Sequence, residues 1–118
     1  MNDLPDISAR RTAHDALELD LDVPAQCPWF EGHFPGRPIL PGVVQVGWAA
    51  HFAGELAGRD QPPTQIERMK FRRPVLPGAR LTLRLALSGA RVRYEYLLHD
   101  ADATASASSG VFAWAEAA

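Results

Sequence analysis

Hydrophobic and polar residues alternate strictly in several segments of this 118-residue chain. Near the N-terminus, apolar residues at positions 17, 19, 21 and 23 alternate with acidic residues at 18, 20 and 22. A period of two is typical of a strand with one buried face and one wet face. We therefore predict a strand here that ends at Pro24, because proline lacks the N–H that a strand ladder needs.

Four more strands are predicted in the C-terminal half of the chain. The clearest spans Leu81–Leu87, and the short turn Ser88-Gly89 should join it as a hairpin to the next alternating segment, Val92–Leu98. Thr64–Val75 is predicted as a strand with Met69 and Phe71 on one face and the basic residues on the other. A turn over residues 99–102 then precedes a last strand within Ala103–Trp114.

One segment has the pattern of a helix rather than of a strand. The run from Val43 to Ala57 is apolar nearly all the way round a helical wheel, which is typical of a buried helix. We predict that this helix begins near Gly42 and ends near Gly58. One helix and about five or six strands indicate an α+β fold, in which a curled antiparallel sheet wraps the helix.

Length and turn content fit a single domain over residues 1–118, with residues 1–8 as a loose or edge-docked N-terminal arm. The sheet edges of so small a domain need cover, which two protomers would supply. The formal net charge of −2 argues against a nucleic-acid partner. One cysteine, Cys27, excludes an intrachain disulfide and a cysteine-based zinc site within one chain. We expect no signal peptide, no membrane span and a cytoplasmic location.

The helix is preceded by a loop, Phe30–Gly42, in which prolines and glycines closely flank His33. Proline fixes φ, and glycine reaches conformations that other residues avoid. Such a loop is stiff without being helix or strand. The sequence therefore predicts a rigid loop that carries one histidine and delivers the chain into the helix.

Two motifs resemble a known family. Gly32-His33-Phe34-Pro35, followed by Pro38-Ile39-Leu40-Pro41-Gly42-Val43-Val44, is similar to the signature of the hotdog-fold 3-hydroxyacyl-acyl-carrier-protein dehydratases of FabZ type. The run Ile66-Glu67-Arg68-Met69-Lys70-Phe71-Arg72-Arg73-Pro74-Val75-Leu76-Pro77-Gly78 resembles the second characteristic stretch of that family. The resemblance implies a hotdog fold and a dimer as the minimal unit. It implies an acyl thioester substrate carried on the phosphopantetheine arm of an acyl carrier protein, with no other cofactor and no metal.

The sequence departs from the family at one position of its catalytic pair. In the family, the loop histidine acts with a helix glutamate of the opposite protomer. By this resemblance, the family's histidine corresponds to His33, and the position of the family's glutamate is occupied by Gly47. The pattern Leu-Pro-Gly-Val-Val-Gln-Val-x-Trp is similar to a divergent branch that serves specialised acyl pathways, including aryl-polyene pigments.

Dehydration of a 3-hydroxyacyl thioester needs a base, donors for the thioester oxygen, and an acid for the departing hydroxyl. His33 suits the first role, because imidazole can be neutral near pH 7. The backbone N–H groups of Gly42 and Val43 suit the second, because they lie unpaired at the positive end of the helix. No residue is an obvious candidate for the acid. His51, about 6 Å further along the helix than Gly47, is the nearer stand-in, and Glu55, about 12 Å further, the more distant. His33 could also handle both proton transfers, or pass one proton through water.

The predicted substrate contacts are Phe34, Pro41, Gly47 and Trp48. The alternative for Trp48 is an ordinary place in the core. For His51 and Glu55, the alternative is an ordinary role as polar helix residues at a dimer seam. The basic residues Arg68, Lys70, Arg72 and Arg73 are predicted to dock the acidic carrier protein, or else to form a solvated strand face.

Three functions compete at this point. The first is a carrier-protein-linked 3-hydroxyacyl dehydratase that uses His33. The second is a hotdog acyl thioesterase, for which Glu55 is the only helix carboxylate that could direct water. The third is a non-catalytic subunit that binds acyl chains or completes a heterodimer, which the replacement of the glutamate by Gly47 favours. The assembly is predicted to be a homodimer or higher homo-oligomer, with a heterodimer as the alternative.

Overall fold

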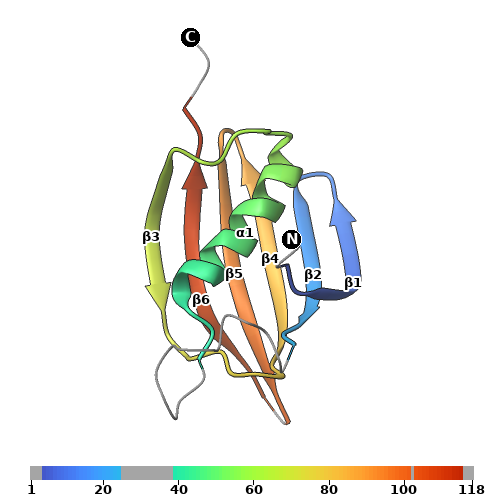
Figure 1. Ribbon diagram of the computed structural model, residues 1–118. Coiled ribbons are helices and arrows are strands. Elements are labelled where there is room, and N and C mark those ends of the chain that lie inside the picture. Colours follow the sequence, from blue (N-terminus) through green and yellow to red (C-terminus); the bar gives the residue numbers. More distant parts are fainter. Residues whose placement is uncertain (1–3, 25–38, 102, 116–118) are drawn as a thin grey trace.

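The computed structural model describes residues 4–24, 39–101 and 103–115 of the chain. Within them, one helix packs against a six-stranded antiparallel sheet (Figure 1). The sheet order is β1-β2-β4-β5-β6-β3, so β1 and β3 form the two edges. The elements are β1 (Asp6–Ala13), β2 (Ala16–Asp22), α1 (Gly42–Ala57), β3 (Gln65–Phe71), β4 (Arg80–Ser88), β5 (Arg91–Asp100) and β6 (Ala103–Ala113).

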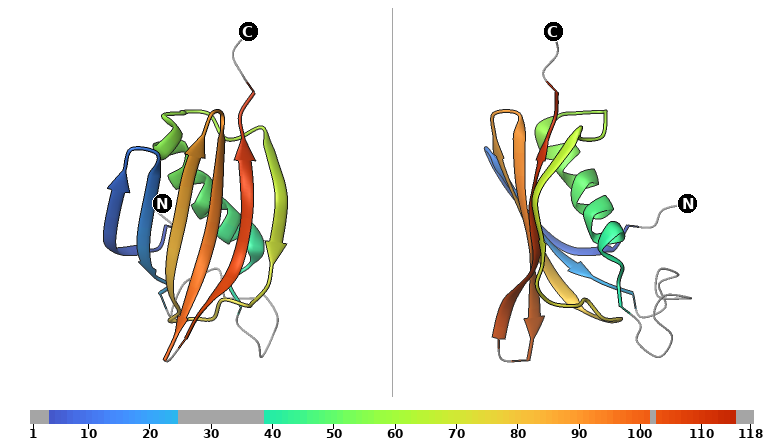
Figure 2. Two further views of the ribbon diagram at one scale, coloured as in Figure 1. Left: turned by 180° about the vertical axis from the view of Figure 1, so that it is seen from behind. Right: turned by 90° about the vertical axis from the view of Figure 1, so that its left-hand side faces the viewer.

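The helix crosses one face of the sheet, and among the described residues the opposite face carries none (Figure 2). The predicted α+β architecture of a single helix against a curled antiparallel sheet is therefore confirmed. The helix runs from Gly42 to Ala57 and is closed by Gly58 in the left-handed conformation, as the sequence predicted. The hairpin of β4 and β5 is also as predicted, but its two-residue turn is Gly89-Ala90 rather than Ser88-Gly89, with Gly89 at a φ of 61°.

The core lies between the helix and the sheet, and period-two alternation fills it from the sheet side. Alternate residues over most of β2, β4 and β5 are buried in this core, including Leu19, Leu83 and Tyr96, whereas Leu87 and Leu98 near the strand ends are partly buried. The helix contributes Val44, Trp48, Ala49, Phe52 and Ala53. Burying one large apolar side chain stabilises the fold by about 1.5–3 kcal/mol relative to leaving it exposed.

The N-terminal arm over residues 1–8 was predicted as loose or edge-docked, and its described part, residues 4–8, is docked at the edge of the sheet. Residues 6–8 belong to β1, which pairs antiparallel with β2 from Asp6 opposite Asp22 to Ala13 opposite Ala16. Pro5 is buried, and Leu4 packs against the core. The sequence gives no signal for β1 because nearly all its residues are exposed, so no apolar alternation marks it.

Two further predictions need correction. The helix was expected to be buried all round, but only one of its faces is covered, and Val43 is 77% exposed on the open face. The turn predicted over residues 99–102 is shorter, because β5 continues through Asp100. The open helix face leaves an apolar surface that the single chain does not cover.

A row of polar side chains crosses the sheet face that lies away from the helix, with one residue from each of five neighbouring strands. Arg11 binds both carboxylate oxygens of Asp20, at 2.7 and 3.0 Å. The Thr82 hydroxyl is 2.8 Å from the Asp20 Oδ1 atom and 2.6 Å from the His99 Nε2 atom, and His99 Nδ1 is 3.1 Å from Thr104 Oγ1. The hydrogen bond from Arg11, followed by that from Thr82, lowers the pKa of Asp20 to about 2.

This lowered pKa predicts how Asp20 contributes to stability at different pH values. A carboxyl whose pKa is lower in the folded chain stabilises it above its ordinary pKa of 3.8, and the contribution is lost as the pH falls through about 2. Asp20→Asn should therefore lower the free energy of unfolding near neutral pH by at most about 1 kcal/mol, as for other exposed ion pairs. Urea unfolding at several pH values measures this.

The difference between Asp20→Asn and wild type should shrink steadily below about pH 4. Asp22→Asn on the same strand serves as a control, because its contact with Arg80 is 3.9 Å long, and it should have a smaller effect. A difference of the same size at neutral and strongly acidic pH would contradict the ion-pair explanation for Asp20.

Candidate active site

The first turn of α1 presents two backbone donors. Pro41 precedes the helix, and its carbonyl accepts the N–H groups of Val44 at 3.0 Å and Gln45 at 3.2 Å. Within the described part of the chain, the N–H groups of Gly42 and Val43 have no acceptor. These amides lie at the positive end of the helix dipole, so the position suits an oxygen that gains negative charge. Their role as donors to a thioester stays a prediction.

An open hollow of about 590 Å³ lies beside this first turn. Phe71, the last residue of β3, covers part of its wall, and a Cβ added at Gly42 would lie 2.8 Å from the Phe71 Cζ atom. Glycine at position 42 therefore allows the ring to approach the backbone closely. The hollow is lined by Ile39, Leu40, Pro41, Gly42, Val43, Gln45, Phe71, Arg72, Arg73 and Pro74.

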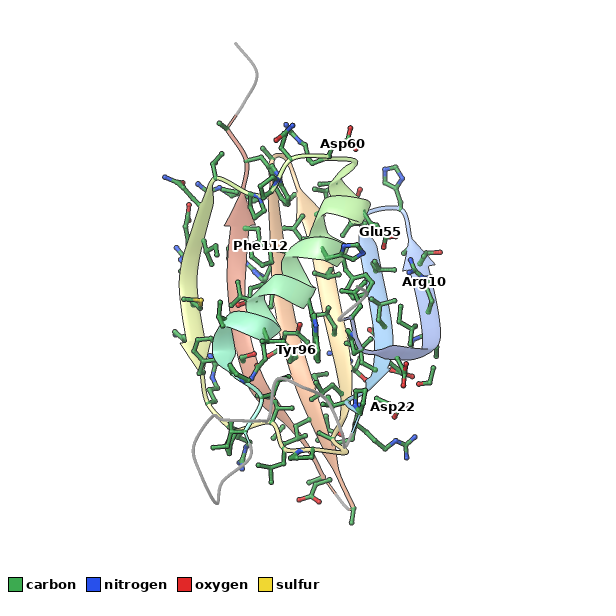
Figure 3. All side chains as sticks on the ribbon, in the orientation of Figure 1. Arg10, Asp22, Glu55, Asp60, Tyr96 and Phe112 are labelled. Carbon is green, nitrogen blue, oxygen red and sulfur yellow. The ribbon has the colours of Figure 1, made fainter. Side chains whose placement is uncertain are left out.

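Three polar groups hold the first turns of the helix from beneath. The Gln45 side chain is buried; its Nε2 atom donates to the Leu40 carbonyl at 3.3 Å, and its Oε1 atom accepts from the Ser108 hydroxyl at 2.9 Å. The Tyr96 hydroxyl donates to the Gln45 backbone carbonyl at 2.6 Å, and Figure 3 shows Tyr96 near the start of the helix. Burial raises the pKa of Tyr96 well above its ordinary value of 10, so its hydroxyl stays protonated.

The sequence analysis assigned no role to Gln45, Tyr96 or Ser108. A signal was present for Gln45, because it is a polar residue within the apolar run that forms the buried helix face. A buried amide needs hydrogen-bond partners, so such a residue points to a local network. Tyr96 and Ser108 had no comparable signal, because the alternation of their strands identifies burial but not hydrogen-bond partners.

The open face of the helix carries Gly47, His51 and Glu55, which line a second hollow of about 710 Å³. Apart from the adjacent residues and the backbone of the helix itself, no described atom lies within 4 Å of a Cβ added at Gly47, so a side chain has room there. His51 is exposed, with its ring centre 5.0 Å from that of the buried Phe52. The family's acid position is therefore empty in the described structure rather than filled by a neighbouring side chain.

Glu55 has a structural partner in the edge strand β1. Its carboxylate lies 3.5 Å from the Arg10 guanidinium, and the two residues lie near each other beside the C-terminal half of α1 (Figure 3). Glu55 is thirteen residues beyond Gly42, which corresponds to about 20 Å along a helix axis. This separation favours the ordinary structural role of Glu55 over a part in proton transfer.

The remaining predicted residues fall in different places. Pro41 lines the hollow at the helix start, whereas Trp48 is buried in the core between helix and sheet. His33 and Phe34 lie outside the described residues. Their predicted roles, and those of Pro41 and Trp48 as substrate contacts, stay predictions.

The predicted basic docking residues are all exposed but do not form one regular row. Arg68 has a φ of 54°, and the register of β3 against β6 shifts between Glu67 and Lys70. This bulge breaks the alternation that was predicted for the strand. Met69 and Phe71 are about half exposed, and the Arg72 side chain donates to Ser109 at 2.9 Å.

Comparison with known proteins places this chain in a family. A family model described as ApeI dehydratase, of the ApeI-like family, matches residues 9–110. The chain belongs to the ApeI-like dehydratase family. FabZ-type relatives are also found: the 3-hydroxyacyl-[acyl-carrier-protein] dehydratase FabZ of Novosphingobium aromaticivorans is 37% identical over 99 residues, with 76% of this chain and 63% of that protein covered. The resemblance read from the two motifs is thereby confirmed.

Solved structures agree with this assignment. A structure described as the dehydratase heterocomplex ApeI:P from Xenorhabdus doucetiae has a TM-score of 0.82 and 30% identity, covering 92% of this chain and 96% of that one. The dehydratase domain of the polyketide PpsC from Mycobacterium tuberculosis, at 18% identity and a TM-score of 0.76, covers 95% of this chain and 44% of that one and shows a shared fold. The hotdog fold that the resemblance implied is confirmed.

This ApeI-like chain spans about half the length of the first curated relatives that it matches. The FabZ protein of Geobacter metallireducens is 41% identical over 73 residues, which cover 54% of this chain and 49% of that protein. Among the described residues, no helix is long and apolar enough to cross a membrane.

The free space at Gly47 yields a stability prediction. Glycine within a helix is destabilising by roughly 0.5–1 kcal/mol relative to alanine, so Gly47→Ala should raise the free energy of unfolding by up to that amount. Gly54→Ala is the matched control on the same helix, because its Cβ would lie 3.2 Å from the Arg59 backbone oxygen. Thermal unfolding of both variants measures the difference, and an equal gain at the two positions would contradict this account.

Proposed function

We propose that this chain takes part in the dehydration of 3-hydroxyacyl thioesters carried on an acyl carrier protein. The observation that carries the proposal is the pair of free amides at Gly42 and Val43, beside an open hollow and directly after the loop of His33. The membership in the ApeI-like dehydratase family supports it. The substrate requires no other cofactor, because the phosphopantetheine arm of the carrier protein holds the thioester.

In the proposed reaction, neutral His33 takes the proton from the carbon next to the thioester carbonyl. Negative charge then grows on the thioester oxygen, which accepts hydrogen bonds from the Gly42 and Val43 amides. The electron pair forms the double bond between the second and third carbons, and the hydroxyl leaves with a proton as water. In other enzymes, removing one such oxyanion donor raises the barrier by about 2.7–4 kcal/mol.

The proton for the departing hydroxyl needs a separate source. This chain has glycine at the family's acid position, and the nearest titratable stand-in on the open helix face is the exposed His51. We infer that the acid comes from a second hotdog chain across the open face of α1. Exposed apolar side chains on the helix, on β3 and after it support such an assembly: Val43, Ile66, Met69, Phe71 and Leu76. The solved heterocomplex of an ApeI-like dehydratase supports a partner of different sequence.

A second candidate function is a subunit that binds acyl chains or completes a heterodimer without reacting itself. Gly47 favours this candidate, because a positioned acid contributes about 10²–10⁴-fold to a rate. It predicts that no variant of the isolated chain gains dehydratase activity.

The decisive experiment follows dehydration of 3-hydroxyacyl thioesters by the appearance of the enoyl thioester. His33→Ala should abolish turnover, because it removes the proposed base. Gly47→Glu should raise the rate of the isolated chain by up to about 10²–10⁴-fold, because an acid returns to a position with free space. Gly47→Gln is the matched control, similar in size but without an acidic proton.

A rise with glutamate but not with glutamine supports the dehydratase. If wild type, Gly47→Glu and mixtures with a partner chain all fail on hydroxyacyl and enoyl thioesters, the non-catalytic candidate takes its place. An unchanged rate in His33→Ala would remove the proposed base.

Carrier-protein docking is proposed for the basic residues of β3 and the segment after it. Charge reversal at Arg68, Lys70 and Arg73 should weaken binding of the acidic carrier protein without unfolding the chain, since all three are exposed. Arg72 is left unchanged, because its contact with Ser109 also supports β6. Binding is measured at low ionic strength, where screening is weak.

The control for docking is Arg59→Glu, at the far end of the helix, which should leave carrier-protein binding unchanged. Equal losses of affinity in both variants would indicate a general charge effect rather than a docking surface. Unchanged affinity in the triple variant would rule out docking at these residues.

A further inference from the structure

Gln45 joins the start of the helix to the sheet through both its side chain and its backbone. Its side chain is only 3% exposed, yet its amide nitrogen and oxygen both have partners. The Leu40 carbonyl can only accept a hydrogen bond, so the amide nitrogen must face it. The amide oxygen then faces the Ser108 hydroxyl of β6, which donates to it.

The contact with Leu40 fixes the chain immediately before the helix. The Leu40 N–H donates to the Val75 carbonyl at 2.8 Å, while its own carbonyl accepts from Gln45. Both sides of this residue are therefore held, two positions before the first free amide at Gly42. Gln45 thus supplies a side-chain donor to the carbonyl of this residue.

We infer that Gln45 is a positioning residue, which holds the Gly42 and Val43 amides at a fixed place above the sheet. Hydrophobic contacts keep the helix on the sheet, but they are not directional and do not set the position of individual amides. The hydrogen bonds of Gln45 are directional and link residue 40, the second turn of the helix and β6. The inference rests on the proposed function, in which those two amides receive the thioester oxygen.

The principal test is Gln45→Met, which keeps the size of the side chain and removes both hydrogen bonds. We expect kcat to fall by about tenfold to a hundredfold, because a small displacement of catalytic donors has a large effect on rate. The KM should change less than kcat, since the other residues that line the hollow remain. The pH profile of kcat should also keep its shape, because His33 is untouched.

Two variants separate positioning from general stability. Tyr96→Phe removes a hydrogen bond to the same helix turn, at the Gln45 backbone carbonyl, and leaves the Leu40 contact in place. It should lower stability while keeping most of kcat. Ser108→Ala removes only the hydrogen bond between the sheet and the Gln45 amide oxygen. It should lower kcat when introduced into the wild-type chain. It should have little further effect on kcat when combined with Gln45→Met, because that variant already lacks this hydrogen bond.

A second readout does not depend on activity. In a ¹H–¹⁵N spectrum, the Gly42 and Val43 amide signals should shift or broaden in Gln45→Met, while the Gly89 signal of the distant β4–β5 turn stays fixed. If wild type is inactive but these signals move, positioning stands and the proposed function fails. If wild type is active, the inference is overturned when the Gly42 and Val43 signals stay fixed, or when kcat falls no more than in Tyr96→Phe.

Discussion

The structure depends on the packing of one apolar helix face against one apolar sheet face. Val44, Trp48 and Phe52 recur every four residues and turn the same side of α1 toward the buried residues of the sheet. This packing fixes the rotation of the helix about its axis. The opposite stripe, with Val43, Gly47 and His51, must then face outward. The location of the family's acid position follows from which helix residues are apolar enough to be buried.

Rotation alone does not place the first turn of the helix at a defined height above the sheet. Apolar packing tolerates small shifts, whereas a buried amide loses its partners if it moves. Gln45 and Tyr96 supply directional contacts at the turn where the free amides begin. Burial of the polar Gln45 side chain would therefore destabilise the fold only if its amide had no hydrogen-bond partners. Together with Ser108, Gln45 makes the geometry of the proposed donors specific.

The sequence predicted those parts of the fold whose signal is local. Alternation identified β2, β4 and β5, and the apolar run identified α1 together with its end at Gly58. The edge strand β1 has no such pattern, because nearly all its residues are exposed, and its place beside β2 appears only in the strand pairing and in contacts such as that of Arg11 with Asp20. The bulge in β3 was equally hidden, since a left-handed φ is uncommon for arginine and follows from the register with β6.

In the candidate site too, features with a local sequence signal were predicted and features that depend on distant contacts were not. The family motifs and the rules for helix ends located Gly42 and Val43 as free donors, and the structure leaves both without an acceptor among the described residues. Gln45 and Ser108 escaped prediction because they lie 63 positions apart and meet only when β6 packs beneath the helix. Phe71 was expected to follow strand alternation, but it reaches the Gly42 backbone because β3 ends beside the first turn.

Gly47 connects the fold to the question of activity. A helix that had adapted fully to a binding role would gain stability from alanine or a larger residue at an exposed position with free space. The chain instead has glycine on the open face of α1, where we propose that a second hotdog chain packs. Glycine at that point allows a partner to approach the backbone, at the cost of helix stability. The absence of an acid and the room for a close approach are therefore two consequences of one residue, and both agree with the proposed assembly, in which a second chain supplies the acid.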